Sequence, residues 1–361
     1  MEPGERDNQA SMSRRDGHEA DGSVNAPFRA YKLVGVGILV VTVISLQSLL
    51  PGIWWSDGRT EHFFKQDALS GLTHQRLGGG AIMYRHERPR LLCFVMMQEK
   101  DHFTGAAEAV YEGWGRNCTL MLYFSNSAKP ISGLNVSDVG IGDRDQTDYL
   151  SGKAHRVWGS LYMKYFANRT SNFDFVMKAD LDTYMLMDNL FEYIVEFPAN
   201  QTAYIGRRFM WDGYTEDNPV TFVAGASVIV NTKTMRLMGA SIAQHKNDAN
   251  HPCSLKAWEK RGHGDDVAMA DCLREEGVIA ADTRDSLGRE RFMVFGPTVM
   301  GDPSHSEHWY PKRAFNAKFG PGCCSDKAIC FHYVSSQRIR ESTLVFNEDD
   351  EVWRWADDST K

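Results

Sequence analysis

The chain has 361 residues, of which 42% are hydrophobic and 24% charged, so it is long enough for one large folded domain or two small ones. Its formal net charge of −7 argues against a nucleic-acid-binding protein, because such proteins usually present a basic face. With 31 glycines and 12 prolines the sequence is not of low complexity.

The first strong feature along the chain is an uncharged apolar segment at residues 33–50. At about 1.5 Å per residue, a helix of this length reaches roughly 27 Å and just crosses a hydrocarbon core. Arg29 and Lys32 precede it, and Trp54 and Trp55 follow it as residues of a membrane interface do. A cleaved signal peptide is the alternative, but a long polar stretch precedes the segment. We therefore expect a single transmembrane signal anchor with a cytosolic N-terminus.

The anchor divides the chain into five expected parts. Residues 1–32 are polar and predict a cytosolic tail. After the anchor at 33–50, residues 51–89 are rich in Gly, Ser, His and charge and predict a stem. Residues 90–340 predict the lumenal folded domain, and residues 341–361 a C-terminal tail.

Two features are consistent with a lumenal location. Four N-glycosylation sequons follow the anchor, at Asn117, Asn135, Asn168 and Asn200. All seven cysteines also follow it, and an oxidising compartment would pair them. The cysteines are Cys93, Cys118, Cys253, Cys272, Cys323, Cys324 and Cys330. Because the count is odd, at least one thiol stays free or joins two chains, which leaves a homodimer as an open alternative. Their spacing does not fit a zinc site.

Apolar runs and helical periodicity alternate after residue 90. We expect strands at residues 90–97, 119–124, 173–179 and 221–230, and helices at 103–114, 148–166, 188–197 (capped by Asp188) and 265–276. This alternation is typical of an α/β domain with a largely parallel sheet.

Two carboxylates follow the third expected strand, at Asp180 and Asp182. Ligands bind outside the carboxyl ends of strands in open α/β sheets, and paired carboxylates suit a hard, partly hydrated cation. Such an ion would neutralise charge that develops on a nucleoside-diphosphate leaving group. An EF-hand does not fit, because Met185 stands where that loop needs glycine. The two-carboxylate pattern alone is weak, and a solvated acidic turn is its ordinary explanation.

Longer motifs surround this pair in a specific order. The segment from Phe173 to Leu190, FDFVMKADLDTYMLMDNL, resembles the donor-site segment of the β-1,3-glycosyltransferases of glycosyltransferase family 31. The segments 206–209 (GRRF), 282–288 (DTRDSLG) and 322–334 (GCCSDKAICFHYV) resemble its core 1 β-1,3-galactosyltransferase branch. The resemblance covers roughly residues 90–335 together with the expected anchor and stem.

The resemblance implies a GT-A fold, which is Rossmann-like with a mostly parallel central sheet flanked by helices. It implies a Golgi type II membrane enzyme that uses Mn²⁺, with Mg²⁺ as an alternative, and a UDP-sugar donor. The implied reaction is an inverting transfer of galactose from UDP-galactose to the 3-hydroxyl of GalNAc on serine or threonine of a glycoprotein. Two alternatives stay open: a fringe-like GlcNAc transfer by the same chemistry, and a non-catalytic lumenal chaperone.

The family motifs also assign roles to individual residues. Asp182 and His332 match metal ligands, and Asp180 matches a residue that contacts the metal, its water or the ribose. Asp266 matches the base that takes the proton from the acceptor hydroxyl, with Asp265 as the second candidate. The ordinary alternative is that both aspartates only cap a helix.

Three basic residues are expected near the donor. Lys153 matches a lysine that meets the donor phosphate or sugar, although a solvent-facing lysine is nearly as good a reading. Arg207 and Arg208 would clamp the substrate or support the metal loop, with structural ion pairing as an equal alternative. Trp114 matches a family tryptophan that we expect in the core rather than at a ligand.

The resemblance further implies disulfides joining Cys93 to Cys118 and Cys253 to Cys272, with one more pair among the remaining three cysteines. The chain departs from the branch at two places. Leu181 replaces the middle of three successive aspartates, and residues 223–227 (VAGAS) replace a Gly-Gly-Ala-Gly-Tyr strand that borders the acceptor site in the family. We therefore expect the reaction class to be better defined than the acceptor.

Overall fold

The computed structural model describes residues 88–126, 129–131, 133–140, 149–168, 170–210, 221–262, 264–307 and 309–358. The expected cytosolic tail, the anchor at 33–50 and nearly all of the stem lie outside these residues. Within them, no helix is both long enough and apolar enough to cross a membrane.

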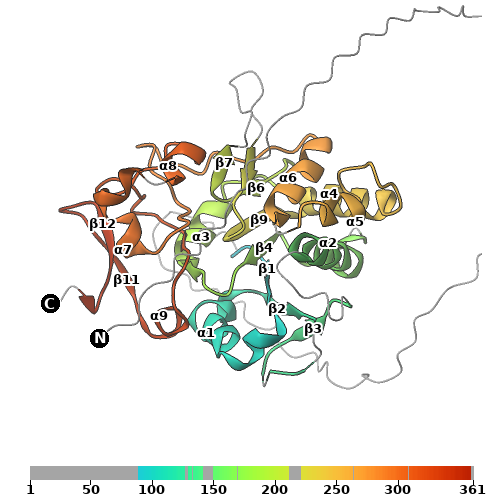
Figure 1. The fold of residues 1–361 in the computed structure, drawn as a ribbon, viewed down its shortest axis with the longest axis horizontal. Helices are drawn as coiled ribbons and strands as arrows, with labels where there is room; N and C mark the ends of the chain where they lie inside the picture. Colours follow the sequence, from blue (N-terminus) through green and yellow to red (C-terminus); the bar gives the residue numbers. More distant parts are fainter. Residues whose placement is uncertain are drawn as a thin grey trace, which may run out of the picture. The chain divides into compact units, whose positions relative to one another are not determined.

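A six-stranded sheet lies at the centre of the described domain (Figure 1). Its strands, in spatial order, are β3 (Val136–Asp138), β2 (Leu120–Ser125), β1 (Leu91–Met96), β4 (Phe175–Ala179), β9 (Ser227–Asn231) and β6 (Tyr204–Ile205). The pairs β3–β2, β2–β1 and β1–β4 are parallel, whereas β9 is antiparallel to both β4 and β6. The sheet is therefore mostly parallel and consistent with the expected GT-A fold.

Two apolar cores cover the two faces of this sheet, as alternation along a strand requires. In β1, Leu91, Cys93 and Val95 face one core, and Leu92 and Phe94 face the other. Both sets are fully buried. A strand buried on both faces reads as a continuous apolar run, which is why residues 90–97 are recognisable in the sequence.

Helices cover both faces of the sheet. The core around Leu92 and Phe94 is closed by α2 (Leu150–Leu161), α4 (Thr232–His245), α5 (Leu255–Glu259) and α6 (Asp265–Glu275). The opposite core is closed by α1 (Ala106–Gly113), α3 (Met187–Ile194) and the C-terminal part of the domain (Figure 1).

The remaining elements are short. They are α7 (Pro297–Met300), α8 (Tyr310–Arg313), α9 (Ser336–Glu341), the 3-10 turns η1 (Glu99–Phe103), η2 (Gly115–Asn117) and η6 (Pro303–Glu307), the π-helical turn η5 (Tyr162–Phe166), and the paired strands β5 (Tyr184–Met185) with β10 (Cys330–Phe331), β7 (Arg208–Met210) with β8 (Thr221–Val223), and β11 (Leu344–Asn347) with β12 (Val352–Trp355).

The expected elements are present with three corrections. The helix expected at 188–197 begins at Met187 and follows Leu186, so Asp188 lies in its first turn instead of capping it. The strand expected at 221–230 is two strands, β8 and β9, joined by a turn. The helix expected at 103–114 is the shorter α1, because Phe103 ends η1 and Gly105, with a positive φ of 73°, precedes α1.

The folded domain continues beyond residue 340, where we expected a tail. Strands β11 and β12 form an antiparallel hairpin. Leu344, Trp353 and Trp355 of this hairpin are buried in the same core as α1 and α3. The Trp353 indole also donates a hydrogen bond to the carbonyl of Ser325 at 2.8 Å. Burial of these large side chains makes the hairpin part of the domain.

The cysteines pair largely as the resemblance implied. Disulfides join Cys93 to Cys118 and Cys253 to Cys272. The third bond joins the neighbours Cys323 and Cys324. Cys330 remains free, and its thiol is buried, 3.3 Å from the Ser227 hydroxyl. In this fold it does not reach the surface to join a second chain.

Candidate functional site

Asp180, Asp182 and His332 converge directly beyond the carboxyl end of β4. One potential ligand atom from each residue lies within 4.8 Å of the others. His332 Nε2 is 2.9 Å from Asp182 Oδ1 and 3.7 Å from Asp180 Oδ2. Among the described residues this is the one group of three or more His, Cys, Asp or Glu side chains close enough to share an ion. Two carboxylates and an imidazole are ligands that suit Mn²⁺.

Backbone pairing brings His332 to the two aspartates. Strand β5 directly follows the Asp180–Asp182 turn and pairs antiparallel with β10, which ends one residue before His332. The amide of Val334 then donates to the carbonyl of Asp182 at 2.9 Å. Trp114 supports the same turn, because its buried indole donates to the carbonyl of Thr183 at 2.9 Å. Trp114 is therefore a core residue, as expected.

A buried lysine joins this cluster to a second acidic pair. Lys178, in β4, is 3% exposed, and its ammonium lies 3.2 Å from Asp180 Oδ1 and 3.2 Å from Asp265 Oδ2. Burial alone would lower the pKa of Lys178, but these two carboxylates raise it above its ordinary value, so the lysine is charged. Lys178 is not among the residues expected at the site from the sequence motifs. A lysine inside an otherwise apolar strand was the available signal, because buried lysines need acidic partners.

The second acidic pair begins α6. Asp265 is buried and its carboxylate is engaged by Lys178, whereas Asp266 is only partly buried and accepts a hydrogen bond from the amide of Val267 at 2.8 Å. Both aspartates therefore lie beside the Asp180 cluster. Because Lys178 binds Asp265, Asp266 is the carboxylate of the pair that is better placed to receive a proton.

The pKa values of these carboxylates are shifted by their surroundings. Burial raises the pKa of Asp266 to about 7, and the charge of Asp265 adds to the shift, although the Val267 amide and Lys178 oppose it. Burial also raises the pKa of Asp180 above its ordinary value, against the charges of Lys178 and His332. Displaced carboxylate pKa values are common at catalytic sites, and a base with a pKa near neutrality suits proton transfer there.

The segment 223–227, which differs from the corresponding strand of the family that the motifs resemble, lies against the turn formed by Asp180 and Asp182. The carbonyl of Gly225 accepts a hydrogen bond from the Lys178 ammonium at 3.2 Å. The carbonyl of Ala226 accepts from the Asp180 amide at 3.2 Å and from the Thr183 hydroxyl at 2.9 Å. The departure therefore alters a wall of the site itself.

Lys153 lies at the carboxyl edge of the parallel strands. It projects from α2, is 3% exposed, and donates to the carbonyl of Met97 at 2.5 Å, just past the end of β1. Its burial excludes the solvent-facing alternative. Since nucleotides bind at this edge of open α/β sheets, its position is compatible with the expected role near the donor.

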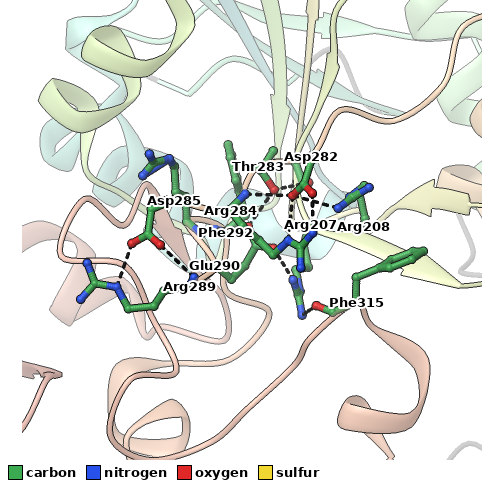
Figure 2. A network of polar contacts seen from close by, with 12 residues as sticks. Arg207, Arg208, Asp282, Thr283, Arg284, Asp285, Arg289, Glu290, Phe292 and Phe315 are labelled. Carbon is green, nitrogen blue, oxygen red and sulfur yellow. Dashed lines mark hydrogen bonds and ion pairs between the residues drawn. The ribbon is translucent and has the colours of Figure 1, made fainter. Parts of the chain in front are cut away.

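Arg207 is the centre of a buried polar network (Figure 2). Its guanidinium pairs with Glu290 and donates to the carbonyl of Phe315 at 2.8 Å. Arg207 and Glu290 are 2% and 4% exposed. Glu290 also accepts from the Thr283 hydroxyl at 2.7 Å and from the amide of Phe292 at 3.2 Å. These contacts favour structural ion pairing over a substrate clamp for Arg207.

Arg208 lies at the edge of the same network. It is 2.8 Å from Asp282 Oδ1, and Arg284 binds the same carboxylate (Figure 2). These arginines hold the pKa of Asp282 well below its usual range, with the hydrogen bond from Arg284 the largest cause. Arg208 thus joins the 206–209 segment to the 282–288 segment, two motifs that lie far apart in the sequence.

A shelf of aromatic rings begins at His332. The Tyr333 ring stacks against the His332 imidazole with ring centroids 4.1 Å apart. The Phe295 ring lies 5.9 Å from Tyr333 and 6.1 Å from Trp309. Tyr333 and Trp309 are 65% and 51% exposed, which is high for rings of this size. Exposed aromatic faces beside a polar site can stack against sugars.

A known protein with similar sequence supports the family resemblance that the motifs indicate. No family model matches the chain. Over 258 residues the chain is 30% identical to "Glycoprotein-N-acetylgalactosamine 3-beta-galactosyltransferase 1" of Xenopus laevis. The match covers 70% of this chain and 64% of the relative, so the chain spans just under two thirds of that protein. The two proteins are homologous over this region.

Proposed function

We propose that this homologue of the core 1 β-1,3-galactosyltransferases of glycosyltransferase family 31 is itself a metal-dependent, inverting galactosyltransferase. Its donor would be UDP-galactose and its acceptor the 3-hydroxyl of GalNAc on serine or threonine of a glycoprotein. The observation that carries the proposal is the convergence of Asp180, Asp182 and His332 beside Asp265 and Asp266, across the carboxyl edge of the sheet.

Asp182 and His332 would hold Mn²⁺, with Mg²⁺ as an alternative, and Asp180 would bind the ion, its water or the ribose. The donor set fits such an ion, because two carboxylates and an imidazole offer atoms within 4.8 Å of one another. When bound, the cation supplies charge neutralisation for the UDP leaving group. Lys178 holds Asp180 in place from the buried side, and Lys153 stands at the same edge of the sheet.

Asp266 would act as the base. In an inverting transfer the bond between the anomeric carbon of galactose and UDP breaks while a bond to the acceptor oxygen forms. The acceptor hydroxyl then gives up its proton, and we assign that proton to the Asp266 carboxylate. Burial and the neighbouring Asp265 raise its pKa to about 7, which makes it a stronger base than an ordinary aspartate. Asp265 serves as the positioning partner of Lys178.

Two parts of the site would select the acceptor. The exposed rings of Tyr333 and Trp309 offer apolar faces on which a sugar ring can stack. Residues 223–227 offer polar backbone groups, and their carbonyls accept hydrogen bonds from Lys178 and from the Asp180 amide. Because this segment differs from the family strand, the assay below varies the acceptor as well as the donor.

The proposal places the enzyme in the Golgi membrane as a type II protein with its catalytic domain in the lumen. The three disulfides support a compartment of the secretory pathway, since disulfides persist in oxidising environments. The anchor expected at residues 33–50 supports the membrane attachment.

The test is a donor-by-acceptor assay with purified chain and Mn²⁺. UDP-galactose and UDP-N-acetylglucosamine are each offered with a GalNAc-threonine peptide and an O-fucosylated peptide. We expect turnover with UDP-galactose and the GalNAc peptide, its loss with EDTA, and its recovery on adding Mn²⁺. Turnover with only the GlcNAc and fucose pair would replace the substrates but keep the chemistry. No transfer and no UDP-sugar hydrolysis with any pair would contradict the enzyme and favour the chaperone alternative.

A further inference from the structure

A hollow of about 590 Å³ opens at one end of the sheet, and the candidate metal site of Asp180, Asp182 and His332 lies at the other end. Its wall includes Asp174 and Phe175 at the start of β4, whereas Asp180 follows the end of that strand. At about 3.3 Å per residue, the five-residue strand separates the two places by more than about 15 Å. The function proposed above therefore does not use this hollow.

A rigid turn forms the rim of the hollow. The amide of Gln201 donates to the carbonyl of Pro198 at 3.0 Å, which closes a turn with Asn200 at its third position. Lys233 donates to the carbonyl of Asn200 at 2.8 Å, and Asn231 donates to the carbonyl of Gln201 at 2.7 Å. Both Lys233 and Asn231 line the hollow. Asn200 is exposed, so a fixed backbone presents it to solvent at this rim.

The aromatic residue three positions before Asn200 lines the same hollow. Phe197 is partly buried, and Tyr193 meets its ring edge-to-face with centroids 5.3 Å apart. Ala199, between Phe197 and Asn200, also lines the hollow. Since Asn200-Gln201-Thr202 is an N-glycosylation sequon, the turn places an acceptor amide beside a fixed aromatic ring.

We propose that Asn200 is N-glycosylated and that the first N-acetylglucosamine of the glycan packs on Phe197 at the mouth of the hollow. This proposal rests on the lumenal location that is part of the proposed function. In the modification, the side-chain amide nitrogen of Asn200 bonds to the anomeric carbon of a lipid-diphosphate-linked oligosaccharide. The carbon–oxygen bond to the diphosphate breaks, the diphosphate leaves, and the amide loses one proton.

The chemistry of the wall suits this sugar. N-acetylglucosamine has an apolar face of C–H groups that packs on aromatic rings, and hydroxyl and acetamido groups around its edge. Phe197 offers the ring. Ser241 and Gln244 are polar side chains of the wall that could meet this edge. Thr232 and Arg236 also line the wall, where they donate to the carbonyls of Phe173 and Phe166.

The other three sequons lack this arrangement. The side-chain amide of Asn117 donates to the carbonyl of Trp114, and the next residue, Cys118, is held in a disulfide. Asn135 accepts a backbone hydrogen bond from Tyr123 at the edge of the sheet. The carbonyl of Asn168 accepts a hydrogen bond from Arg236, which lines the hollow. The nearest aromatic residue before Asn168 is Phe166, which is 1% exposed and therefore unavailable to a sugar.

The experiment uses the full chain produced in animal cells that glycosylate secretory proteins. Glycopeptide mass spectrometry gives the occupancy of each sequon, and thermal unfolding is measured for three forms. These are the wild type, the wild type trimmed to single N-acetylglucosamine residues by an endoglycosidase, and Asn200→Gln. We expect near-complete occupancy at Asn200. We also expect trimming to leave the melting temperature unchanged and Asn200→Gln to lower it by about 2–4 °C.

Phe197→Leu completes a double-mutant cycle with Asn200→Gln and separates sugar packing from the contact between Phe197 and Tyr193. We expect Asn200→Gln to have little further effect in the Phe197→Leu background. An equal effect in both backgrounds, or a bare Asn200 on a chain that carries glycans elsewhere, would overturn this proposal alone. If none of the four sequons carried a glycan, the lumenal location would fail with it.

Discussion

His332 Nε2 lies 2.9 Å from Asp182 Oδ1, although 150 positions separate the two residues in the sequence. The contact depends on the pairing of β5 with β10 and on the backbone hydrogen bond from Val334 to Asp182. The C-terminal part of the domain therefore completes the candidate metal site that β4 begins.

The first prediction concerns this contact. Asp182→Ala removes one of the three candidate ligands, so we expect Mn²⁺-dependent transfer to fall by more than about 100-fold, beyond the usual cost of losing an outer partner of a ligand. Mn²⁺ affinity, followed by isothermal titration calorimetry, should fall with it.

Asp188→Ala is the matched control, because Asp188 is a fully exposed aspartate in the first turn of α3, close in sequence to the site. It should leave both transfer and Mn²⁺ affinity near wild type. Near-normal rates in Asp182→Ala would refute the assignment of Asp182 as a ligand.

The second prediction concerns Lys178. Its replacement by methionine leaves the buried carboxylate of Asp265 and that of Asp180 without their shared cation. Breaking a buried ion pair from one side typically costs about 3–5 kcal/mol, and we expect a loss of this order in the free energy of unfolding, measured in urea.

Lys327→Met breaks an exposed pair with Glu192 and should cost less than about 1 kcal/mol. Equal costs for the two variants would contradict the buried role of Lys178.

Much of the sheet was predictable from the sequence because buried parallel strands are continuous apolar runs. β1 and β4 fall within the expected segments, and β2 extends one residue past its expected end, to Ser125. The position of Asp180 and Asp182 was predictable for the same reason, since both follow such a strand. The role of His332 required the family motif, because nothing local in the sequence indicates that β10 pairs with β5.

Other features depend on tertiary packing and were not predictable from local patterns. The β11–β12 hairpin lies where a tail is expected, because polar residues dominate its sequence. Only the fold shows that its two tryptophans fill the core. The partner of Arg207 lies 83 positions away, so the local sequence does not distinguish a substrate clamp from a structural ion pair. The bridge from Lys178 to Asp265 likewise joins two segments whose contact only the fold creates.

The third prediction separates the two roles of Arg207. Arg207→Met leaves Glu290 buried without its ion-pair partner, and Glu290→Met leaves Arg207 in the same state. Each single variant should therefore lose about 3–5 kcal/mol of unfolding free energy. The double variant replaces the pair by apolar groups and should recover part of that loss. If the pair is structural, the folded double variant keeps the KM for UDP-galactose. A KM raised tenfold or more in the double variant would instead support a substrate clamp.

The fourth prediction is the pH dependence of transfer. A base acts in its ionised form, and the pKa of Asp266 is raised to about 7, so we expect kcat/KM to rise with pH up to about 7 and then level off. Asp265→Asn removes the negative charge that adds to this shift, and the acidic limb should move to lower pH. A limb that stays in place in Asp265→Asn would show that Asp266 is not the titrating group.

The fifth prediction follows from the same raised pKa and concerns stability. The native state keeps a proton on Asp266 up to about pH 7, whereas an unfolded aspartate releases it near its ordinary value of 3.8. Between these two pH values the native state binds more protons than the unfolded state. The stability that this group contributes is therefore present at low pH, and the free energy of unfolding falls as the pH rises through this range. Asp266→Asn cannot ionise and should escape that loss, so we expect it to be more stable than wild type at pH 8 by up to about 4 kcal/mol. The two proteins should converge near pH 4. Urea unfolding at both pH values measures the difference, and a variant less stable than wild type at pH 8 would favour the simple helix-capping role for Asp266.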